Sequence, residues 1–217
     1  MSNNNRNGIS PETALWQAIV LQEYEDAEEI ISKRKPDLNK AHIGETLLSK
    51  TVHKGDEEMM RLLLDKGADI NGCDGGSDSP LTVAIRMGRR GILAFLLDKG
   101  ADPDKPDGKD LLPLTAAVIK RDIDSIRLLL QHGADLEAAD SWGKTALSVA
   151  KDWGNREPEV AALMKGYEIH RARYDSRIEA AFDKGSAEAF TPMKPLRLGL
   201  TPAQPVKSRK KKNPAPL

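Results

Sequence analysis

The sequence predicts an all-α solenoid of about five stacked repeats, each a helix–turn–helix pair followed by a short hairpin loop. The tripeptide Gly-Ala-Asp recurs at 67–69, 100–102 and 133–135, so each step is 33 residues. The longer segment RLLLDKGADIN at 61–71 returns as AFLLDKGADPD at 94–104 and as RLLLQHGADLE at 127–137. A single unit of this size cannot bury its apolar face alone, whereas five stacked units form one continuous core and a long curved surface.

The first helix of each repeat is predicted from residues that favour helix starts. Thr46, Ser79 and Thr145 are expected N-caps, because their side-chain oxygens can accept from the free amides of the first turn. The aligned starts are Thr46-Leu47-Leu48, Ser79-Pro80-Leu81, Leu112-Pro113-Leu114 and Thr145-Ala146-Leu147, and one step before them stands Thr13-Ala14-Leu15. Pro80 and Pro113 fit the first helical position, which needs no amide hydrogen. Small residues further along these helices (Ala84, Ala117 and Ala150) allow neighbouring helices to approach closely.

Glycines predict where both helices of a repeat end. We expect Gly55, Gly88 and Gly154 to end first helices as left-handed caps. The second helices are expected to bury the apolar triplets 62–64, 95–97 and 128–130. Gly67, Gly100 and Gly133 then end the second helices and turn the chain into the hairpin.

These motifs resemble the ankyrin-repeat family, whose pattern is roughly G-x-T-P-L-H-x-A-A-x-x-G followed by L-L-L-x-x-G-A-D. The resemblance covers residues 9 to about 165, and period, caps and the Gly-Ala-Asp turn all agree. The sequence departs from the pattern at the histidine after Pro-Leu, where it has Trp16, Ser49, Thr82, Thr115 and Ser148. In addition, the first unit has PDLN (36–39) one residue out of register, and the fourth has Arg121 in place of the terminal glycine.

The expected organisation follows from this register. A flexible N-terminus (1–8) precedes a repeat domain (9–165), whose units span about 9–40, 41–73, 74–106, 107–139 and 140–165. Residues 166–190 carry apolar side chains at helical spacing, which predicts a helix that covers the end of the fifth unit or binds a partner. Residues 191–217 hold six prolines and a basic run, which predicts a disordered tail.

Charge is unevenly distributed along the chain. The sequence has 33 basic and 33 acidic residues, but residues 191–217 contain seven of the basic and none of the acidic ones. Residues 1–190 therefore hold 26 basic and 33 acidic residues, a net charge of −7. The basic run (Lys207, Arg209, Lys210, Lys211 and Lys212) has three interpretations: a solvated tail, a localisation or nucleic-acid contact, or docking onto an acidic surface.

Three features favour a cytoplasmic protein. The N-terminus has no apolar stretch typical of a secretory signal, and no run approaches the roughly 18 apolar residues that cross a bilayer. The single cysteine, Cys73, cannot form an internal disulfide. A nuclear protein, or an effector secreted without a cleaved signal, fits the same observations.

No pattern of residues points to catalysis, a metal or a cofactor. The sequence lacks HExxH, CxxC, a phosphate-cradling glycine loop and the Gly-x-Ser-x-Gly motif. The loop Asp74–Asp78 is faintly similar to a calcium loop, but its twelfth position is Ile85 where a glutamate is needed. We expect Cys73 to be unreactive, because it has no basic neighbour, and His132 to lie at a helix C-terminus.

The resemblance implies that a partner binds the hairpin tips and the exposed ends of the first helices. The matching positions in the second to fifth units are His42, Ile43, Glu45, His53, Lys54, Gly75, Gly76, Asp78, Arg86, Met87, Gly108, Lys109, Leu111, Ile119, Lys120, Ser141, Trp142, Lys144, Asp152 and Trp153. Exposed apolar residues among them would form the centre of an interface. Trp142 and Trp153 are open to another interpretation, since Trp142 could pack on the next hairpin and Trp153 under the C-terminal helix.

The sequence therefore predicts a monomeric protein-interaction module with no enzymatic activity. It would act as an adaptor or as an inhibitor that masks a partner, and a bacterial effector or toxin-neutralising role fits the architecture. The acidic body favours a basic partner. The alternative is a nucleic-acid-associated or nuclear regulatory protein that binds through its basic tail, although an acidic body would repel phosphate.

Overall fold

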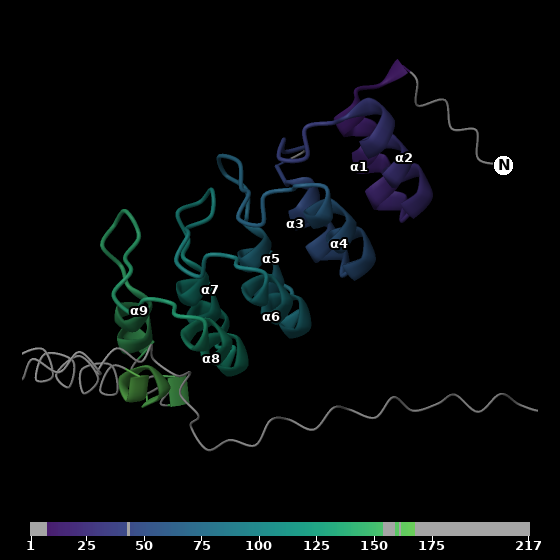
Figure 1. The fold of residues 1–217 in the computed structure, drawn as a ribbon. Helices are drawn as coiled ribbons and strands as arrows, with labels where there is room; N and C mark the ends of the chain where they lie inside the picture. The colour runs from purple at the N-terminus through teal and green to yellow at the C-terminus, as the bar shows by residue number, and fades with distance from the viewer. Residues whose placement is uncertain (1–7, 43, 154–158, 161, 168–217) are drawn as a thin grey trace, which may run out of the picture.

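The computed structural model describes residues 8–42, 44–153, 159–160 and 162–167, and this part of the chain forms a row of helix pairs (Figure 1). The helices with defined bounds are α1 (Pro11–Leu21), α2 (Tyr24–Arg34), α3 (Leu47–Lys54), α4 (Glu57–Asp65), α5 (Pro80–Arg86), α6 (Arg90–Asp98), α7 (Pro113–Lys120), α8 (Ile123–Gln131) and α9 (Ala146–Trp153). Residues 159–160 and 162–167 are helical as well. Within the described residues the only β-structure is two isolated bridges, so the prediction of an all-α solenoid is confirmed.

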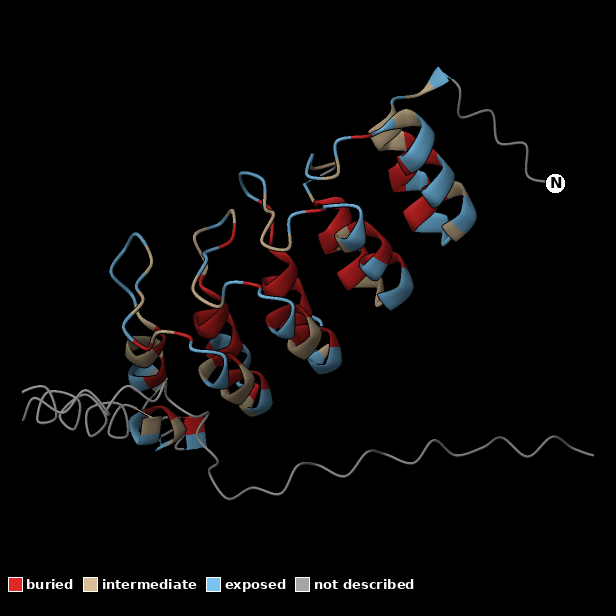
Figure 2. Ribbon diagram, viewed as in Figure 1, coloured by how far each residue is buried: buried red, intermediate tan, exposed pale blue. Residues whose placement is uncertain are grey.

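The odd-numbered helices form the inner row of the stack. Each packs against the next, from α1 to α9, and each of α1, α3, α5 and α7 also packs against the second helix of its own repeat. Ala84, Ala117 and Ala150 are buried in this row, where their small side chains allow the close approach. Figure 2 shows the buried residues on the facing sides of the helices and the exposed ones outside, as one continuous core requires.

The predicted N-caps are confirmed in three repeats. Thr46 Oγ1 accepts from the amide of Ser49 at 3.2 Å, Ser79 Oγ from that of Thr82 at 3.2 Å, and Thr145 Oγ1 from that of Ser148 at 3.0 Å. Each of these bonds satisfies one of the amides that the first turn leaves free.

The first repeat departs from the predicted start at Thr13. Helix α1 begins one turn earlier, because Ser10 accepts from the amide of Thr13 at 3.2 Å and Pro11 occupies the first helical position. The same cap-and-proline pair that identifies α5 is therefore present here three residues upstream of the register.

First helices end on left-handed residues at one position per repeat. Gly55 has φ of 76° and Gly88 has φ of 67°, as predicted, while Gly154 lies outside the described residues. Gln22 and Arg121 occupy the equivalent positions and adopt the same conformation, both with φ of 60°. A side chain in this conformation costs about 1–2 kcal/mol, so the fold imposes the turn where the sequence lacks glycine.

The second helices bury fewer residues of the apolar triplets than predicted. Leu63, Leu96 and Leu129, at equivalent positions, are fully buried, whereas Leu64, Phe95, Leu128 and Leu130 are only partly covered. Consecutive residues of a helix point about 100° apart, so three in a row cannot all face the same neighbour. Residues one turn earlier, such as Met60 and Ile126, complete the buried face.

The turns after the second helices are tied together along the stack. Asn39 Oδ1 accepts from the amide of Asp69, Asn71 Oδ1 from Asp102 and Asp104 Oδ1 from Asp135, each at 2.8 Å. The one-residue offset of PDLN is absorbed by α2, which continues to Arg34 and ends on the left-handed residue Lys35. Asn39 therefore still reaches the turn of the second repeat.

The ends of the chain are described only in part. Of the predicted C-terminal helix (166–190), residues 166 and 167 are helical and the rest lies outside the described residues. The expected tail (191–217) and most of the expected flexible N-terminus (1–8) lie outside them too. In the part of the chain that is described, no helix combines the length and the apolar character that a membrane span needs.

Candidate binding surface

The hairpin loops project from one side of the stack, beside the odd-numbered helices (Figure 1). We call this surface, made of the hairpins and the first helices, the hairpin face. The large apolar side chains that are exposed among the described residues all belong to it: Val20, Leu21, Met87, Ile119 and Trp142. Trp142 is 74% exposed, Ile119 51% and Met87 41%, so all three can contact a partner without unfolding.

The hairpin that bears Trp142 is held by two side-chain carboxylates that accept hydrogen bonds from its backbone amides. Asp140 Oδ1 accepts from the amides of Trp142 and Lys144 at 3.0 and 2.8 Å. Asp110 Oδ2, from the preceding hairpin, accepts from the amide of Ser141 at 2.6 Å. Hydrogen bonds from Ser141 also lower the pKa of Asp110, so this carboxylate remains charged in mildly acidic solution. Trp142 is thus exposed on a hairpin whose backbone is fixed.

Two of the predicted contact residues, Lys54 and Lys120, bind the preceding repeat. Lys54 Nζ donates to the carbonyl of Val20 at the end of α1. Lys120 Nζ donates to the carbonyls of Ile85, at 2.8 Å, and Arg86 at the end of α5. Arg89 Nη2 donates in the same way to His53 at the end of α3, at 2.9 Å. These side chains satisfy carbonyls that helix ends leave free, and a partner would have to compete for them.

In the second repeat, Glu45 is in contact with two basic side chains. Its carboxylate contacts Lys50 Nζ at 3.2 Å and His53 Nδ1 at 3.0 Å. Burial raises the pKa of Glu45, but the hydrogen bonds from His53 and Lys50 outweigh it, so the net shift is downward. His42 lies beside Trp16, with ring centroids 5.0 Å apart.

In the third repeat, Asp78 differs from the expectation of an exposed contact. Its side chain is buried, with the residue only 7% exposed, and it forms ion pairs with Arg86 and with Lys109, whose Nζ lies 2.7 Å from Oδ1. The Asp78 carbonyl also accepts from Ser49 Oγ at 3.0 Å. Asp78 therefore joins three repeats, and Arg86 and Lys109 are paired with it although their side chains are about half exposed.

A groove of about 590 Å³ lies on the hairpin face between the fourth and fifth repeats. We call it the hairpin-side groove. Its apolar wall consists of side chains from both repeats: Leu111, Ile119, Trp142 and Val149. Five of the predicted positions thus line one groove: Leu111, Ile119, Trp142, Lys144 and Asp152.

The polar residues of the same groove are Thr115, Asp140, Lys144 and Asp152. Thr115 is 4% exposed, and its Oγ1 is one of the few buried polar atoms of the described chain without a hydrogen-bond partner. Neither Lys144 nor Asp152 forms an ion pair within the described residues, although both are exposed. The groove therefore combines an apolar wall with three polar groups, on Thr115, Lys144 and Asp152, that are unpaired within the described residues.

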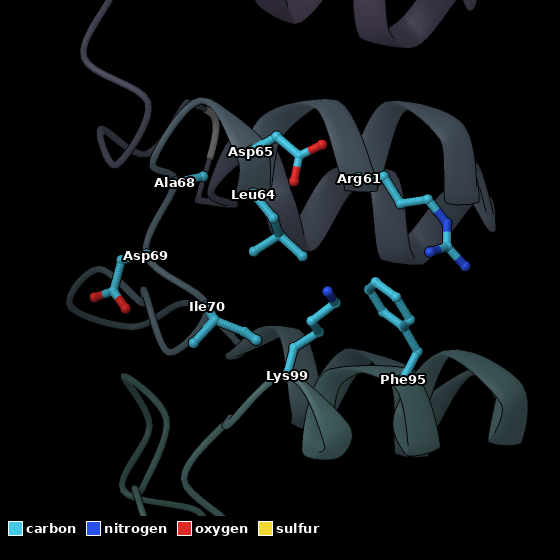
Figure 3. A pocket seen from close by; sticks show the side chains of 8 residues that line it. All are labelled: Arg61, Leu64, Asp65, Ala68, Asp69, Ile70, Phe95 and Lys99. Atoms are coloured by element: carbon cyan, nitrogen blue, oxygen red, sulfur yellow. The ribbon is translucent and has the colours of Figure 1, made fainter.

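A second groove, of about 570 Å³, lies on the opposite side between the second and third repeats, and we call it the helix-side groove (Figure 3). Here Arg61 and Lys99 converge on Phe95, with the guanidinium carbon 4.3 Å and Nζ 5.7 Å from the ring centroid. Both cations are already stabilised by the ring, which makes this groove less available to a partner than the hairpin-side groove.

Metal binding or chemical reactivity would depend on the remaining titratable residues. They contain no group of three or more His, Cys, Asp or Glu side chains that could hold a metal ion. Burial raises the pKa of Cys73, and this outweighs the opposing effect of Lys105, a basic neighbour that the sequence analysis did not identify. His132 caps the end of α8, as expected, and its Nε2 lies 3.7 Å from Asp98 Oδ1.

Some predicted residues fall outside this description. Ile43, the basic run and the side chain of Trp153, which ends α9, are not among the described parts of the chain. Conversely, sequence reasoning missed Val20 and Leu21, although they occupy the same register as His53 and Lys54. It also missed Thr115 as an unpaired group, for which the missing cap hydroxyl at Leu112 was the available indication.

Comparison with known families agrees with this architecture. A model of ankyrin repeats in three copies matches residues 15–107, and a model of a single ankyrin repeat matches residues 110–141. Together these matches cover more than half of the chain and extend from α1 to the hairpin of the fifth repeat. No curated protein matches the sequence.

Proposed function

Because the chain belongs to the ankyrin-repeat family, whose repeats generally mediate protein–protein interaction, we propose that it binds a partner protein through its hairpin face. The observation that carries this proposal is Trp142, which is 74% exposed on a hydrogen-bonded hairpin. A partner that covers this indole removes its apolar surface from water, and aromatic residues buried in this way are typical interface hot spots.

The net charge of residues 1–190 favours a basic partner, and the hairpin face supplies the apolar anchors. Residues 1–190 have a net charge of −7, which would accelerate encounter with a cationic surface. Met87, Ile119 and Trp142 supply the apolar contacts that retain the partner after encounter. His42, His53, Arg86, Lys109 and Lys144 also belong to the hairpin face and would supply polar contacts to the partner.

The choice between inhibitor and adaptor depends on the number of surfaces used. An inhibitor that masks a partner needs the hairpin face alone, and this is the role that the exposed residues support. An adaptor needs a second surface, for which the helix-side groove is the candidate. A toxin-neutralising or effector protein would use the hairpin face in the same way as an inhibitor.

A nucleic-acid-associated role would depend on the basic run at 207–212. The acidic body would repel phosphate, so binding to DNA or RNA should disappear when residues 191–217 are removed and weaken steeply with salt. Tight nucleic-acid binding by residues 1–190 at physiological salt would instead show that the repeats themselves bind nucleic acid, and it would favour a nucleic-acid-binding role over a protein partner.

The proposal is tested by isolating the partner with the tagged full-length chain and titrating it calorimetrically against variants. We expect Trp142→Ala combined with Met87→Ala to weaken binding by about 2 kcal/mol or more, with an unchanged thermal melt, because both side chains lie outside the core. The matched control is Phe95→Ala in the helix-side groove, which should leave affinity unchanged. The reverse pattern would place the interface on the helix side and refute the proposal.

A further inference from the structure

We propose that the hairpin-side groove is the anchor pocket of this interface and receives a tyrosine side chain of the partner, flanked by an acidic residue near Lys144 and a basic residue near Asp152. This inference rests on the proposed function and specifies the chemistry that the face recognises. It depends on three properties of the groove: its charge pattern, its apolar wall and the hydroxyl of Thr115.

The charge pattern is seen by comparing two positions in each repeat. In the second repeat these two positions hold Glu45 and His53, which contact each other. In the third repeat they hold Asp78 and Arg86, which also contact each other. In the fourth repeat the same positions hold Leu111 and Ile119. The second and third repeats thus cover this part of the surface with a pair of polar side chains in contact, whereas the fourth leaves an apolar surface open.

In the fifth repeat the order of charges is reversed and the pair is not formed. Lys144 occupies the position of Glu45 and Asp78, and Asp152 that of His53 and Arg86. The structure shows no ion pair for Lys144 or Asp152 within the described residues. The groove is therefore bordered by one cation on the hairpin and one anion at the end of α9, each available to an opposite charge.

Between these two charges the groove favours an aromatic side chain. Leu111, Ile119 and Val149 provide apolar contact, and the exposed ring of Trp142 offers an offset or edge-to-face partner. A lysine or arginine side chain in the groove would gain little, because repulsion from Lys144 offsets attraction to Asp152. A ring thus fits the centre better than a lysine or arginine does.

Thr115 indicates that the ring bears a hydroxyl. In the second, third and fifth repeats a hydroxyl at this position pairs with the cap hydroxyl or a nearby backbone carbonyl: Ser49 with Thr46, Thr82 with Ser79, and Ser148 with the carbonyl of Thr145. In the fourth repeat the cap is Leu112, which offers no hydroxyl, and Thr115 Oγ1 has no hydrogen-bond partner among the described residues. Rotation about χ1 moves the hydroxyl to another staggered position, in which a phenolic hydroxyl in the groove can form a hydrogen bond with it.

The test uses three short peptides and the full-length chain. Ac-Glu-Gly-Tyr-Gly-Arg-NH2 is the designed probe, its phenylalanine analogue lacks the hydroxyl, and Ac-Arg-Gly-Tyr-Gly-Arg-NH2 carries more positive charge without the acid. Binding is followed by NMR through the indole N–H of Trp142, assigned with Trp142→Phe, and through the Ile119 methyl groups. We expect the designed probe to shift these signals and to bind about three- to tenfold more tightly than the phenylalanine analogue.

Two variants separate the components of the pocket. Thr115→Val keeps the shape and should abolish the difference between tyrosine and phenylalanine peptides. Lys144→Asp combined with Asp152→Arg recreates the arrangement of Asp78 and Arg86, and it should weaken the designed probe at least about fivefold while the melt is retained. Equal binding of the tyrosine and phenylalanine peptides, tighter binding of the doubly basic peptide, or shifts that survive the charge exchange would each overturn the assignment.

The native partner distinguishes this inference from the proposed function. If Trp142→Ala with Met87→Ala weakens the partner but Thr115→Val and the charge exchange do not, the hairpin face binds without a tyrosine anchor, and the inference is wrong. If the double alanine variant also binds normally, the proposed function itself fails.

Discussion

Replacing Asp122 should destabilise the stack more than any other single helix cap. Asp122 Oδ1 accepts from the Ser125 amide at 3.3 Å and from Arg90 Nη2 at 2.9 Å, and Oδ2 accepts from Ser125 Oγ at 2.9 Å. Asp122→Ala removes the cap of α8, worth about 1 kcal/mol, and leaves the buried Ser125 hydroxyl without this partner, at a further 1–3 kcal/mol.

The ion pair between Asp122 and Arg90 contributes less to stability than the helix cap and the hydrogen bond to the Ser125 hydroxyl. The Arg90 side chain is about half exposed and keeps a second partner in Asp124, 2.8 Å from Nη1, so its loss contributes at most about 1 kcal/mol. The expected total is about 3 kcal/mol in the free energy of unfolding, measured by urea denaturation.

Asp56→Ala is the matched control for this prediction. Asp56 caps α4 by accepting one hydrogen bond, from the Met59 amide at 3.0 Å. Its removal should therefore lower the free energy of unfolding by only about 1 kcal/mol. Equal losses for Asp56→Ala and Asp122→Ala would refute the reasoning, because they would show that the contacts of Asp122 with Arg90 and Ser125 add nothing to the cap.

The pH dependence supplies a second check on Asp122. Burial raises the pKa of Asp122, but hydrogen bonds from Arg90 and Ser125 outweigh it, so the folded-state pKa lies below the unfolded one. A lowered pKa contributes stability that is complete above the unfolded value of about 3.9 and is lost as the pH falls through the folded value. The advantage of the wild type over Asp122→Ala should thus be constant near neutrality and shrink below about pH 4.

Three further predictions concern stability. Leu129→Ala should cost about 2–5 kcal/mol in urea denaturation because it empties a buried site, and the half-buried Leu128→Ala should cost clearly less; equal costs would contradict the burial pattern. Gln22→Gly should raise the free energy of unfolding by about 0.5–1 kcal/mol, whereas Gly88→Ala should lower it by a similar amount, because both residues have a left-handed backbone. If both substitutions change the free energy of unfolding in the same direction, backbone conformation does not explain the effect. Removing residues 191–217 should change the melting temperature by less than about 5 °C, and a larger drop in a calorimetric scan would show that the tail docks on the repeats.

The sequence was sufficient for most features that depend on near neighbours. The caps at Thr46, Ser79 and Thr145 involve residues three apart, and Gly55 and Gly88 act through their own backbone. The exposure of Trp142 was one of two interpretations that the pattern allowed, and the structure shows it. The start of α1 was misplaced because the strict 33-residue step was preferred over the local Ser10-Pro11 pair.

The features that sequence reasoning missed depend on residues about one repeat apart. Asp78 is buried because Lys109, 31 residues later, reaches back to its carboxylate. Lys120 reaches back by 34 and 35 residues to the carbonyls that end α5. A periodic pattern gives the position of each long side chain along its own repeat, but not the direction in which it extends across the stack.

This distinction affects how family positions should be transferred to a candidate interface. A charged side chain beside a free helix carbonyl or a carboxylate is satisfied within the fold, as Lys54, Lys120 and Arg86 are, and a partner gains only the difference between two similar contacts. An exposed apolar side chain such as Ile119 or Trp142 has no such internal alternative, so covering it contributes the full free energy of removing its surface from water. In this protein the apolar positions should therefore determine partner affinity, together with Lys144 and Asp152, which form no ion pair within the described residues. The paired charges of the second and third repeats should mainly determine stability.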